Sequence, residues 1–382
     1  MIDRFNNEIE DHVLFRESVR RFVEQEVLPE FEQWESEGIV SRKFWDKAGG
    51  AGVLCPQVPE EYGGPGCSFK FNAMVIEEFA GLGVVGPMNN ISVHSDVCAG
   101  YILSYGTEEQ KQKWLPKMVS GEVVCAIAMT EPGTGSDLQG VKTRAKKIDD
   151  HYVVNGSKTF ISNGQHADLV IVVAKTNDEE GAAGTSLLLV ESDREGVGRG
   201  RNLEKLGHHS SDTSELFFQD VKVPETNILG AEGRGFAALM AELPQERLTI
   251  AVASIAAAQR AFDITCQYMR ERTAFGKPII NFQANAHKMA DLRADLSVGW
   301  AFVDQCIAQH EMCALTATNA SIAKLWCSEL QGKLVDQCLQ FFGGYGFMKE
   351  YEISRLFADA RVQRIYGGTS EIMRELISRS LS

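Results

Sequence analysis

The sequence predicts an α+β protein that is mainly α, with three domains in the order helical, β and helical. Apolar residues with helical periodicity dominate the first third of the chain and its last part. Between these parts lie short runs rich in β-branched and aromatic residues, which are typical of strands. A chain of 382 residues is long enough for two or three packed units. We therefore expect an N-terminal helical domain over 1–120, a β-barrel-like middle domain over 121–227 and a C-terminal four-helix bundle over 228–382.

The N-terminal part opens with an amphipathic helix. Apolar side chains recur at Val19, Phe22 and Val27 with helical spacing, and Pro29 is expected to disrupt or end the helix. Another helix is expected to begin at Thr107, which is followed by Glu-Glu-Gln. This pattern is a capping box, in which the threonine and glutamine side chains satisfy each other's free backbone amides.

Residues 81–86 read Gly-Leu-Gly-Val-Val-Gly, a literal GxGxxG motif. The motif indicates a dinucleotide site only where a strand leads into it and a helix leaves it. Here the preceding residues, 75–79, have helical character, and no alternation of strands and helices surrounds them. We therefore interpret the glycines as a turn between two helices.

The middle part contains six runs that we expect to be strands: Val123–Met129, Tyr152–Val154, Lys158–Ile161, Leu169–Val173, Ser186–Val190 and Leu216–Val223. Asn155 and Gly156 separate the second run from the third. Both residues tolerate the positive φ of a type I′ turn, so this dipeptide predicts a β-hairpin.

Long amphipathic helices are expected in the C-terminal part. Apolar side chains three or four residues apart run from Met289 to Ile307 and from Ile322 to Phe341. Two further helices are expected, one from Arg247 to about Arg270 and a final one that ends near Arg379. Together they would make an up-and-down bundle of four helices.

Composition excludes several classes of protein. The chain has 52 acidic and 38 basic residues and a formal charge of -14, which disfavours nucleic acid and anionic lipid as partners. No stretch approaches the roughly 18 consecutive apolar residues of a membrane span. The nine cysteines form no CxxC pair and the eight histidines no HExxH motif, so we expect reduced thiols and no metal site. Residues 1–4, Met-Ile-Asp-Arg, do not resemble a leader peptide, and we expect a cytoplasmic protein.

A loop rich in glycine and hydroxyl groups follows the first expected strand. Residues 129–137 read Met-Thr-Glu-Pro-Gly-Thr-Gly-Ser-Asp. Glycines would let an anion or a planar ring approach the backbone, while Thr130 and Ser136 could donate hydrogen bonds. An ordinary polar surface loop has the same composition, so both interpretations remain open at this point.

Several motifs in order along the whole chain resemble the acyl-CoA dehydrogenases, FAD enzymes that desaturate acyl-CoA thioesters between Cα and Cβ. The motifs are Tyr-Gly-Thr-Glu-Glu-Gln at 105–110, Ala-Met-Thr-Glu-Pro at 128–132, Asn-Gly-Ser-Lys at 155–158, Arg-Thr-Ala-Phe-Gly-Lys-Pro at 272–278, Gln-Phe-Phe-Gly-Gly-Tyr-Gly-Phe at 340–347 and Ile-Tyr-Gly-Gly-Thr-Ser at 365–370. The resemblance implies the same three-domain architecture that the periodicity predicts.

The resemblance implies an FAD site built from several parts of the chain. In the same subunit it assigns cofactor contacts to Ile127, Met129, Thr130, Ser136, Phe160, Ser162, Thr369 and Glu371, with Phe160 where the family typically has a tryptophan that stacks on the flavin. Arg272, Phe275 and Gln283 match residues that hold the FAD of a neighbouring subunit, and Gln340, Phe341, Phe342, Gly343 and Gly344 match the loop that receives it. These assignments imply a homotetramer, a dimer of dimers.

The catalytic base is expected to be Glu246. Most of the family carries a glutamate where this chain has Gly367, and glycine cannot abstract a proton. The long-chain and isovaleryl-CoA subgroups carry it instead on the first helix of the bundle, and the sequence around Glu246 resembles the long-chain subgroup most closely. We expect Pro244 to start a helix and to place Glu246 in its first turn, with burial outweighing the helix dipole in setting its basicity. Glu242, Glu350 and Glu371 are weaker rivals.

The reaction implied is removal of the α-proton by Glu246 as a hydride leaves Cβ for the flavin, which gives a trans-2-enoyl-CoA. Ser136, Gln245, Arg247, Gly367 and Gly368 are expected on the substrate side, with the backbone N–H of Gly367 and an FAD hydroxyl polarising the thioester. Electrons would pass to an electron-transferring flavoprotein. The base position favours long-chain or branched acyl groups, including terpenoid acids.

Three alternatives are considered. An FAD-dependent acyl-CoA or nitroalkane-type oxidase would share the fold, and a non-catalytic scaffold would explain the glycine at position 367. A serine hydrolase that acts on CoA thioesters is disfavoured because the chain has no GxSxG elbow.

Overall fold

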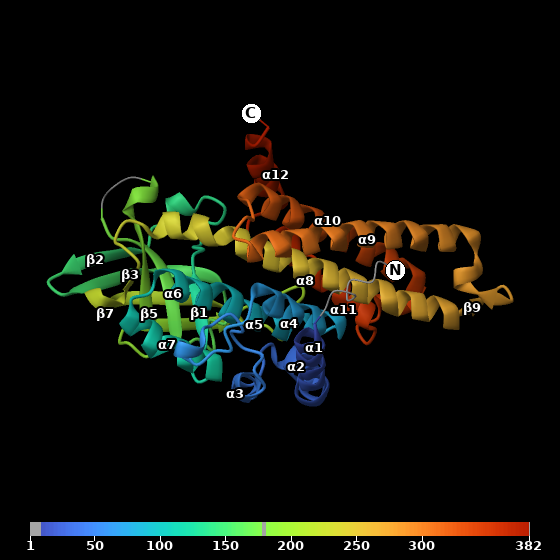
Figure 1. The fold of residues 1–382 in the computed structure, drawn as a ribbon, viewed down its shortest axis with the longest axis horizontal. Coiled ribbons are helices and arrows are strands. Elements are labelled where there is room, and N and C mark those ends of the chain that lie inside the picture. The colour runs from blue at the N-terminus through green and yellow to red at the C-terminus, as the bar shows by residue number, and fades with distance from the viewer. Residues whose placement is uncertain (1–8, 178–180, 382) are drawn as a thin grey trace.

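The structure, a computed structural model, describes residues 9–177 and 181–381 and divides into helices, a β region and long helices, in that order along the chain (Figure 1). The β region lies at one end and the long helices at the other, with the first helices packed along one side. Residues 1–4, from which we expect no leader peptide, lie outside the described residues.

The N-terminal helices are α1 (Glu10–Phe22), a π-helical turn (Val23–Val27), α2 (Leu28–Glu37), α3 (Arg42–Gly50), α4 (Phe69–Gly81), α5 (Val85–Ser92), a second π-helical segment (Val93–Cys98), α6 (Ala99–Tyr105) and α7 (Glu108–Ser120). The first helix is disrupted before Pro29, as expected, because α1 gives way to the π turn after Phe22, but the chain does not leave the helical conformation there. The π turn leads straight into α2, and Pro29 lies in the first turn of that helix, where a missing N–H does no harm.

Two local predictions in this part are confirmed. The side chain of Thr107 accepts a hydrogen bond from Gln110 N at 3.3 Å, and Gln110 Oε1 accepts one from Thr107 N at 3.0 Å, which completes the capping box at α7. The GxGxxG segment joins α4 to α5, with Gly83 at φ 75°, so it is a turn between helices.

The β region is one eight-stranded sheet with the order β6-β7-β3-β2-β4-β5-β8, and β1 pairs in parallel with β4. Its strands are β1 (Cys125–Ala128), β2 (Arg144–Ile148), β3 (His151–Ser162), β4 (Leu169–Lys175), β5 (Thr185–Glu191), β6 (Val197–Asn202), β7 (Thr213–Pro224) and β8 (Ile228–Leu229). The sequence does not predict β2 and β6, because these strands carry mainly basic residues and glycine and bury few side chains.

The predicted hairpin at Asn155 and Gly156 is also wrong. Both residues lie inside the unbroken strand β3, at a register shift against β7. The hairpin turn lies six residues earlier, between Ile148 and His151, with Asp149 at φ 52°. A bulge and a turn need similar residues, and only the strand pairing distinguishes them.

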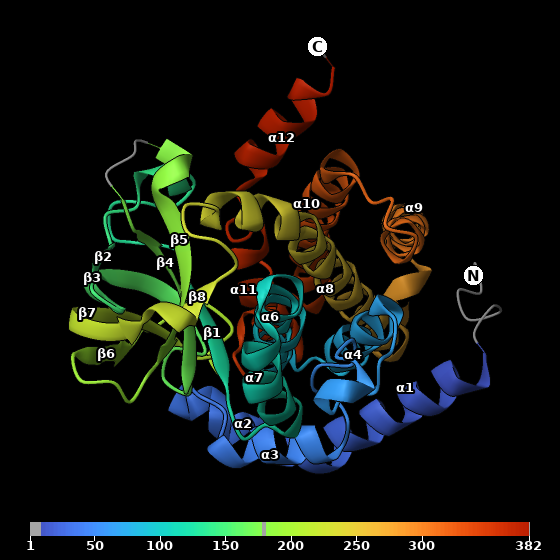
Figure 2. The same ribbon diagram turned by 60° about the vertical axis from the view of Figure 1, so that its left-hand side comes forward.

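Three long helices form the C-terminal body: α8 (Gly235–Glu271), α9 (Gln283–Glu311) and α10 (Ala317–Phe342). A small hairpin of β9 (Thr273–Ala274) and β10 (Lys277–Pro278) joins α8 to α9, and α11 (Glu352–Asp359) and α12 (Ser370–Arg379) follow α10. The expected final helix, α12, is only ten residues long; it packs beside α10 and projects from the body (Figure 2). None of the described helices has the length and apolar character needed to cross a membrane.

One continuous apolar core joins the three parts. Leu169, Ile171 and Val173 on β4 point into the same core as the N-terminal helices and the long helices, whereas Val170 and Val172 belong to a second core on the other face of the sheet. Strand β4 is therefore buried on both faces, which explains why its sequence is uniformly apolar. This packing holds the sheet, α6 and α8 against one another.

Candidate active site

Glu246 lies on α8, with only 9% of its surface exposed. Its Oε1 atom accepts a hydrogen bond from the hydroxyl of Tyr101, on α6, at 2.9 Å. Burial raises the pKa of Glu246 to about 7, and the charge of Glu242 adds to this, while the Tyr101 hydrogen bond and Arg247 act in the opposite direction. This carboxyl group can therefore exchange a proton near neutral pH.

The predicted position of Glu246 in a first helical turn is wrong. Helix α8 begins at Gly235, and Pro244 lies inside it, so Glu246 is three turns from the helix N-terminus. The helix dipole acts only within the first turn and does not stabilise this carboxylate. Its basicity is set by burial, as expected, without the opposing effect of the dipole.

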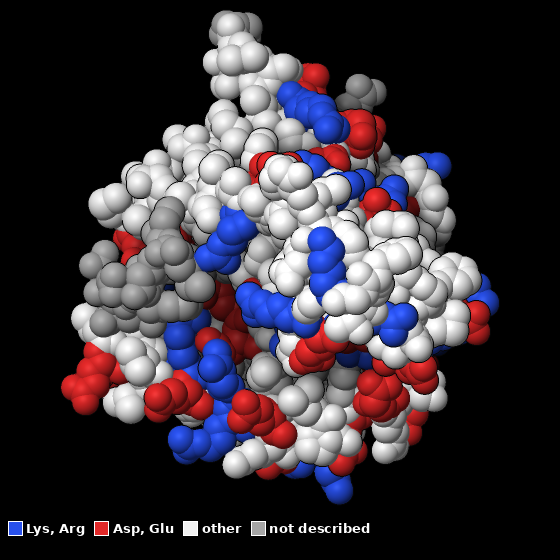
Figure 3. Space-filling view, turned by 90° about the vertical axis from the view of Figure 1, so that its right-hand side faces the viewer, with Lys and Arg blue, Asp and Glu red and all other residues white. Residues whose placement is uncertain are grey.

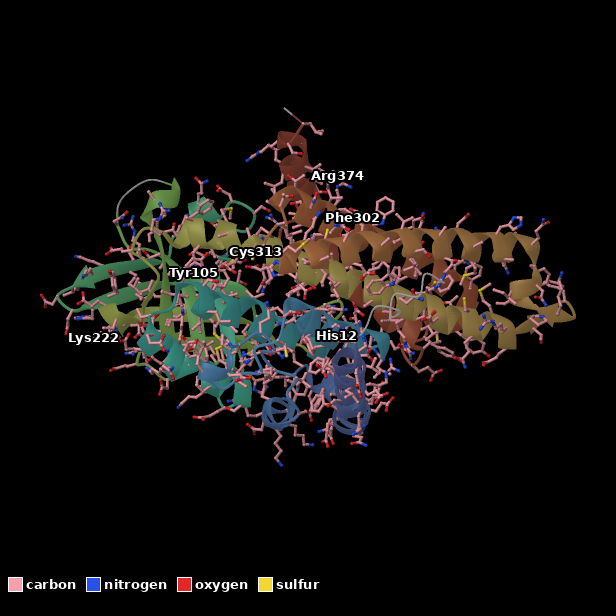
Figure 4. The ribbon with its side chains drawn as sticks, viewed as in Figure 1. His12, Tyr105, Lys222, Phe302, Cys313 and Arg374 are labelled. Atoms are coloured by element: carbon pink, nitrogen blue, oxygen red, sulfur yellow. The ribbon has the colours of Figure 1, made fainter. Side chains whose placement is uncertain are left out.

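The other candidate bases are placed less favourably. Glu242 is half-buried one turn earlier on α8, and burial raises its pKa although Ser104 and Tyr105 hydrogen-bond to it. Tyr105 lies at the end of α6 that faces the β region (Figure 4). Glu350 and Glu371 are exposed.

Gly367 and Gly368 form a tight turn beside Arg247, with φ of 62° and 97°. Arg247 is 6% exposed, and its Nε atom donates to Gly367 O at 3.5 Å. The fully buried Lys324, on α10, donates from Nζ to Gly368 O at 2.6 Å. Arg247, the residue after Glu246 on α8, therefore connects the helix that carries Glu246 to the glycine turn.

Gln245 has a different environment from Glu246. Its Nε2 atom donates to Asp96 O at 2.7 Å, and its Oε1 atom lies 3.0 Å from His310 Nε2. The side chain therefore links α8 to the second π-helical segment and to the end of α9. Both the nitrogen and the oxygen of the Gln245 amide therefore have hydrogen-bond partners within the protein.

The loop after β1 is held by a buried ion pair. Lys158 Nζ lies 2.9 Å from Glu131 Oε1 and 3.0 Å from Met129 O. Glu131 also accepts from the backbone N–H groups of Lys142 and Thr143 at 2.7 and 2.9 Å. Although burial opposes ionisation, the charge of Lys158 and these hydrogen bonds hold the pKa of Glu131 below its usual value. The loop is therefore a fixed structure and not merely a polar turn.

Phe160 lies next to this loop on β3. The residue is 67% exposed and its backbone has φ 59°, at a point where the pairing of β3 with β7 shifts register. Thr159 N donates to Thr130 O at 3.0 Å, which joins the strand to the loop. A strained backbone that presents an aromatic ring to solvent is a site ready to stack against a planar ligand.

The other residues predicted near Phe160 share its surroundings. Ile127, Met129 and Thr130 are half-buried, as is Ser162 at the end of β3, and Ser136 is exposed. Nothing lies within 4 Å of where a Cβ atom on Gly133 or Gly135 would be, so the loop backbone is open there. These residues could hold one face of a flavin.

A second group of predicted residues lies at the far end of the long helices. Arg272, Gln340, Gly343 and Gly344 line a cavity of about 470 Å³, which Phe341, Phe342, Tyr268, Ile279, Tyr345 and Met348 complete. The guanidinium of Arg272 lies 5.9 Å from the centre of the Tyr345 ring. None of Glu246, Phe160 and Gly367 lines this cavity.

Phe275 and Gln283 belong to the same end of the molecule. Phe275 is 96% exposed at the tip of the β9–β10 hairpin with φ 52°, and Gln283 is exposed at the start of α9. Basic and acidic side chains are interspersed over this face (Figure 3).

Thr369 and Glu371 lie at the start of α12. Thr369 Oγ1 caps this helix by accepting from Ile372 N at 3.4 Å. The Glu371 side chain is 80% exposed and lies 3.7 Å from Arg374, on the projecting helix (Figure 4).

Sequence reasoning missed two residues of the site, Tyr101 and Lys324. Tyr101 lies in an apolar helix and Lys324 in a helical repeat, and neither has a neighbour in sequence that marks it as functional. The apolar spacing of α10 skips position 324, so the sequence offers no signal for either residue.

Comparison with known proteins agrees with this architecture. Family models for the N-terminal, middle and C-terminal domains of acyl-CoA dehydrogenase match residues 9–122, 126–221 and 233–382. The chain is 49% identical over 373 residues to the mitochondrial long-chain specific acyl-CoA dehydrogenase of Rattus norvegicus, covering 97% of this chain and 86% of the relative.

Solved structures agree as well. An acyl-CoA dehydrogenase from Geobacillus kaustophilus superposes with a TM-score of 0.96 at 47% identity and 99% coverage of both chains. An acyl-CoA dehydrogenase of Bacillus anthracis, solved with FAD, superposes with a TM-score of 0.92 at 33% identity, covering 98% of this chain and 67% of that one. The chain belongs to the acyl-CoA dehydrogenase family.

Proposed function

We propose that this protein is an FAD-dependent acyl-CoA dehydrogenase that converts an acyl-CoA thioester to a trans-2-enoyl-CoA. The observation that carries the proposal is the buried Glu246, whose pKa of about 7 suits a base at neutral pH. It lies beside Arg247, which contacts the Gly367–Gly368 turn. A carboxylate base next to free backbone amides is the pair of groups that abstraction of an α-proton requires.

The cofactor is FAD. Met129, Thr130 and Phe160 would hold its ring system, with Ile127, Ser162, Thr369, Glu371 and Ser136 around them, as the open loop and the exposed aromatic ring support. When bound, FAD supplies the acceptor for the hydride that leaves Cβ of the substrate.

Glu246 takes the proton from Cα. An acyl chain in the site would exclude water, which keeps the carboxylate basic, and the Tyr101 hydroxyl holds it in one orientation. The thioester oxygen gains negative charge as the proton leaves. The backbone N–H of Gly367 would stabilise this charge, and this role needs no side chain at position 367.

The far cavity supports an assembly of several subunits. Arg272, Phe275, Gln283, Gln340, Gly343 and Gly344 gather at one end of the long helices, away from Phe160 and Glu246. If these residues also contact FAD, the cofactor they contact belongs to another subunit. We therefore propose a homotetramer arranged as a dimer of dimers.

The substrate class follows from the relatives and from the position of the base. The rat relative is specific for long chains, and isobutyryl-CoA and isovaleryl-CoA dehydrogenases are 37% and 34% identical to this chain. We propose long-chain or branched acyl groups, an electron-transferring flavoprotein as acceptor, and a cytoplasmic location, which the nine free cysteines support.

An anaerobic titration tests the function. The purified yellow protein is mixed in turn with short, medium, long and branched acyl-CoA thioesters, and bleaching of the flavin band is followed. We expect fastest bleaching with a long or branched chain. Bleaching followed by rapid reoxidation in air would indicate an oxidase, and a protein that takes up no FAD would indicate a scaffold.

A further inference from the structure

Lys324 is an unusual residue for the interior of a helical bundle. Its side chain has no exposed surface, and in the described part of the chain no carboxylate forms a salt bridge with it. The ammonium instead donates to the backbone oxygen of Gly368 at 2.6 Å. A buried charge without an ion pair destabilises the fold, so its presence requires an explanation.

A second buried cation contacts the same turn. Arg247 Nε donates to Gly367 O at 3.5 Å, so the carbonyl groups of the two consecutive glycines face two positive charges. The two cations repel each other. Burial is the main cause that lowers the pKa of Lys324, and the repulsion from Arg247 lowers it further. The two cations come from different helices, α8 and α10, and meet only at the glycine turn.

The carbonyl contacts determine where the amides point. In a planar trans peptide the C=O and N–H bonds point in opposite directions. Holding the oxygens of Gly367 and Gly368 on the two cations therefore turns the N–H groups of Gly368 and Thr369 away from them. In the described residues, the N–H groups of positions 367 to 369 have no hydrogen-bond acceptor.

We propose that Lys324 is a positioning residue for the dehydrogenation: by holding Gly368 O it fixes the conformation of the Gly367–Gly368 turn, and with it the residue whose N–H, at Gly367, we propose as the donor to the thioester oxygen. The inference rests on the proposed function and adds to it a residue on α10 that touches neither substrate nor base. The charge also contributes positive potential at the point where enolate charge develops.

The charge of Lys324 gives the proposal a measurable signature. The groups that face it are Arg247 on α8, Glu329 on α10 and Glu371 on α12; burial and then Arg247 lower its pKa to about 8, against the two glutamates. Above that pH the ammonium loses its proton and its positive charge. We expect kcat to fall on the alkaline side, in addition to the fall on the acidic side that Glu246 causes.

The test compares Lys324→Met with Lys324→Gln and the wild type, each loaded with FAD. Methionine keeps the length and removes the charge and the donor, and glutamine keeps a donor without the charge. For Lys324→Met we expect kcat to fall by about 10- to 100-fold, less than for loss of a direct oxyanion donor, with KM changed by less than about 3-fold. The alkaline fall should disappear in both variants, and Lys324→Gln should retain more activity than Lys324→Met.

The matched control is Lys333→Met, on the same helix, whose ammonium lies 2.9 Å from Asp295 with 55% of its side chain exposed. It should leave kcat and both limbs of the pH profile unchanged. If the wild type reduces its flavin and Lys324→Met has the same kcat and the same alkaline fall, the role of Lys324 is overturned while the proposed function stands. Failure of every acyl-CoA to bleach the wild type removes the proposed function as well. If Lys324→Met does not fold, a wild-type rate that does not fall between pH 8 and about 9.5 overturns the proposal.

Discussion

Ile250 occupies the space that a side chain on Gly367 would need: a Cβ atom placed on Gly367 would overlap Ile250 Cδ1, one turn beyond Glu246 on α8. Gly367 also has φ 62°, in the left-handed region. Both the neighbouring side chain and the backbone conformation therefore favour glycine at position 367. We propose that Glu246 on α8 supplies the carboxylate that much of the family is expected to carry there.

Gly367→Ala should lower the free energy of unfolding by about 1–2 kcal/mol, because alanine disfavours a left-handed backbone. Urea unfolding monitored by circular dichroism measures the change. The double variant Ile250→Ala/Gly367→Ala separates the two causes. Ile250→Ala removes the overlap and leaves the backbone conformation as it is. If Gly367→Ala lowers the free energy of unfolding equally in the wild type and in Ile250→Ala, the overlap contributes nothing.

Glu246→Gln should keep FAD bound and lose at least about 1000-fold in the rate of flavin reduction, since an amide cannot accept the α-proton. Stopped-flow measurement of the flavin band with saturating acyl-CoA gives this rate directly. The control Glu350→Gln removes an exposed carboxylate of the rival set and should stay within about twofold of the wild type. Equal losses in the two variants would contradict the assignment of the base.

Reduction should require Glu246 ionised, so the rate should rise with pH through about 7, the raised pKa of this group. Tyr101→Phe removes a hydrogen bond that favours the charged form and lowers this pKa. The midpoint of the acidic limb should therefore move to higher pH, which a pH profile of single-turnover reduction detects.

The comparison for Tyr101→Phe is Tyr62→Phe, which removes another tyrosine–glutamate hydrogen bond of 2.9 Å, to Glu108. It should leave the acidic limb where it is. A shift of the midpoint to lower pH in Tyr101→Phe would show that the hydroxyl favours the neutral acid.

Glu131→Gln should destabilise the protein by about 3–5 kcal/mol, because it leaves the fully buried Lys158 without its carboxylate. The loop that Lys158 fixes through Met129 O should loosen, and FAD should be released more readily on dilution. Thermal unfolding and flavin fluorescence measure the two effects. Glu131→Gln/Lys158→Met removes both charges and should recover part of the stability; no recovery would mean that the carboxylate acts through its backbone contacts alone.

Patterns that depend on neighbouring residues were predictable from the sequence. The capping box at Thr107, the turn at Gly83 and the strand at Leu169–Lys175 follow from local hydrogen-bonding capacity or from a run of apolar residues. The long helices follow from their apolar spacing. The choice of Glu246 needed more than spacing, since it came from the resemblance of several motifs to one family.

Patterns whose meaning depends on distant partners were predicted wrongly or missed. Pro244 is expected to start a helix, but α8 already runs through it from Gly235, which packs against Thr185 and Ser186 on β5, and tertiary packing of this kind stabilises a helix beyond its local signals. Asn155 and Gly156 suit a turn and form a bulge, because β7 pairs with the strand on both sides of them.

The amino-acid sequence by itself determined the order of helices and strands, the family and the position of the carboxylate. Only the tertiary structure decided what that carboxylate can do. Tyr101 on α6 and the burial of α8 set the pKa of Glu246, and Lys324 on α10 reaches a turn 44 residues further along the chain. Desolvation and hydrogen bonding act between side chains in space, so they have no signature in the spacing of residues along the chain.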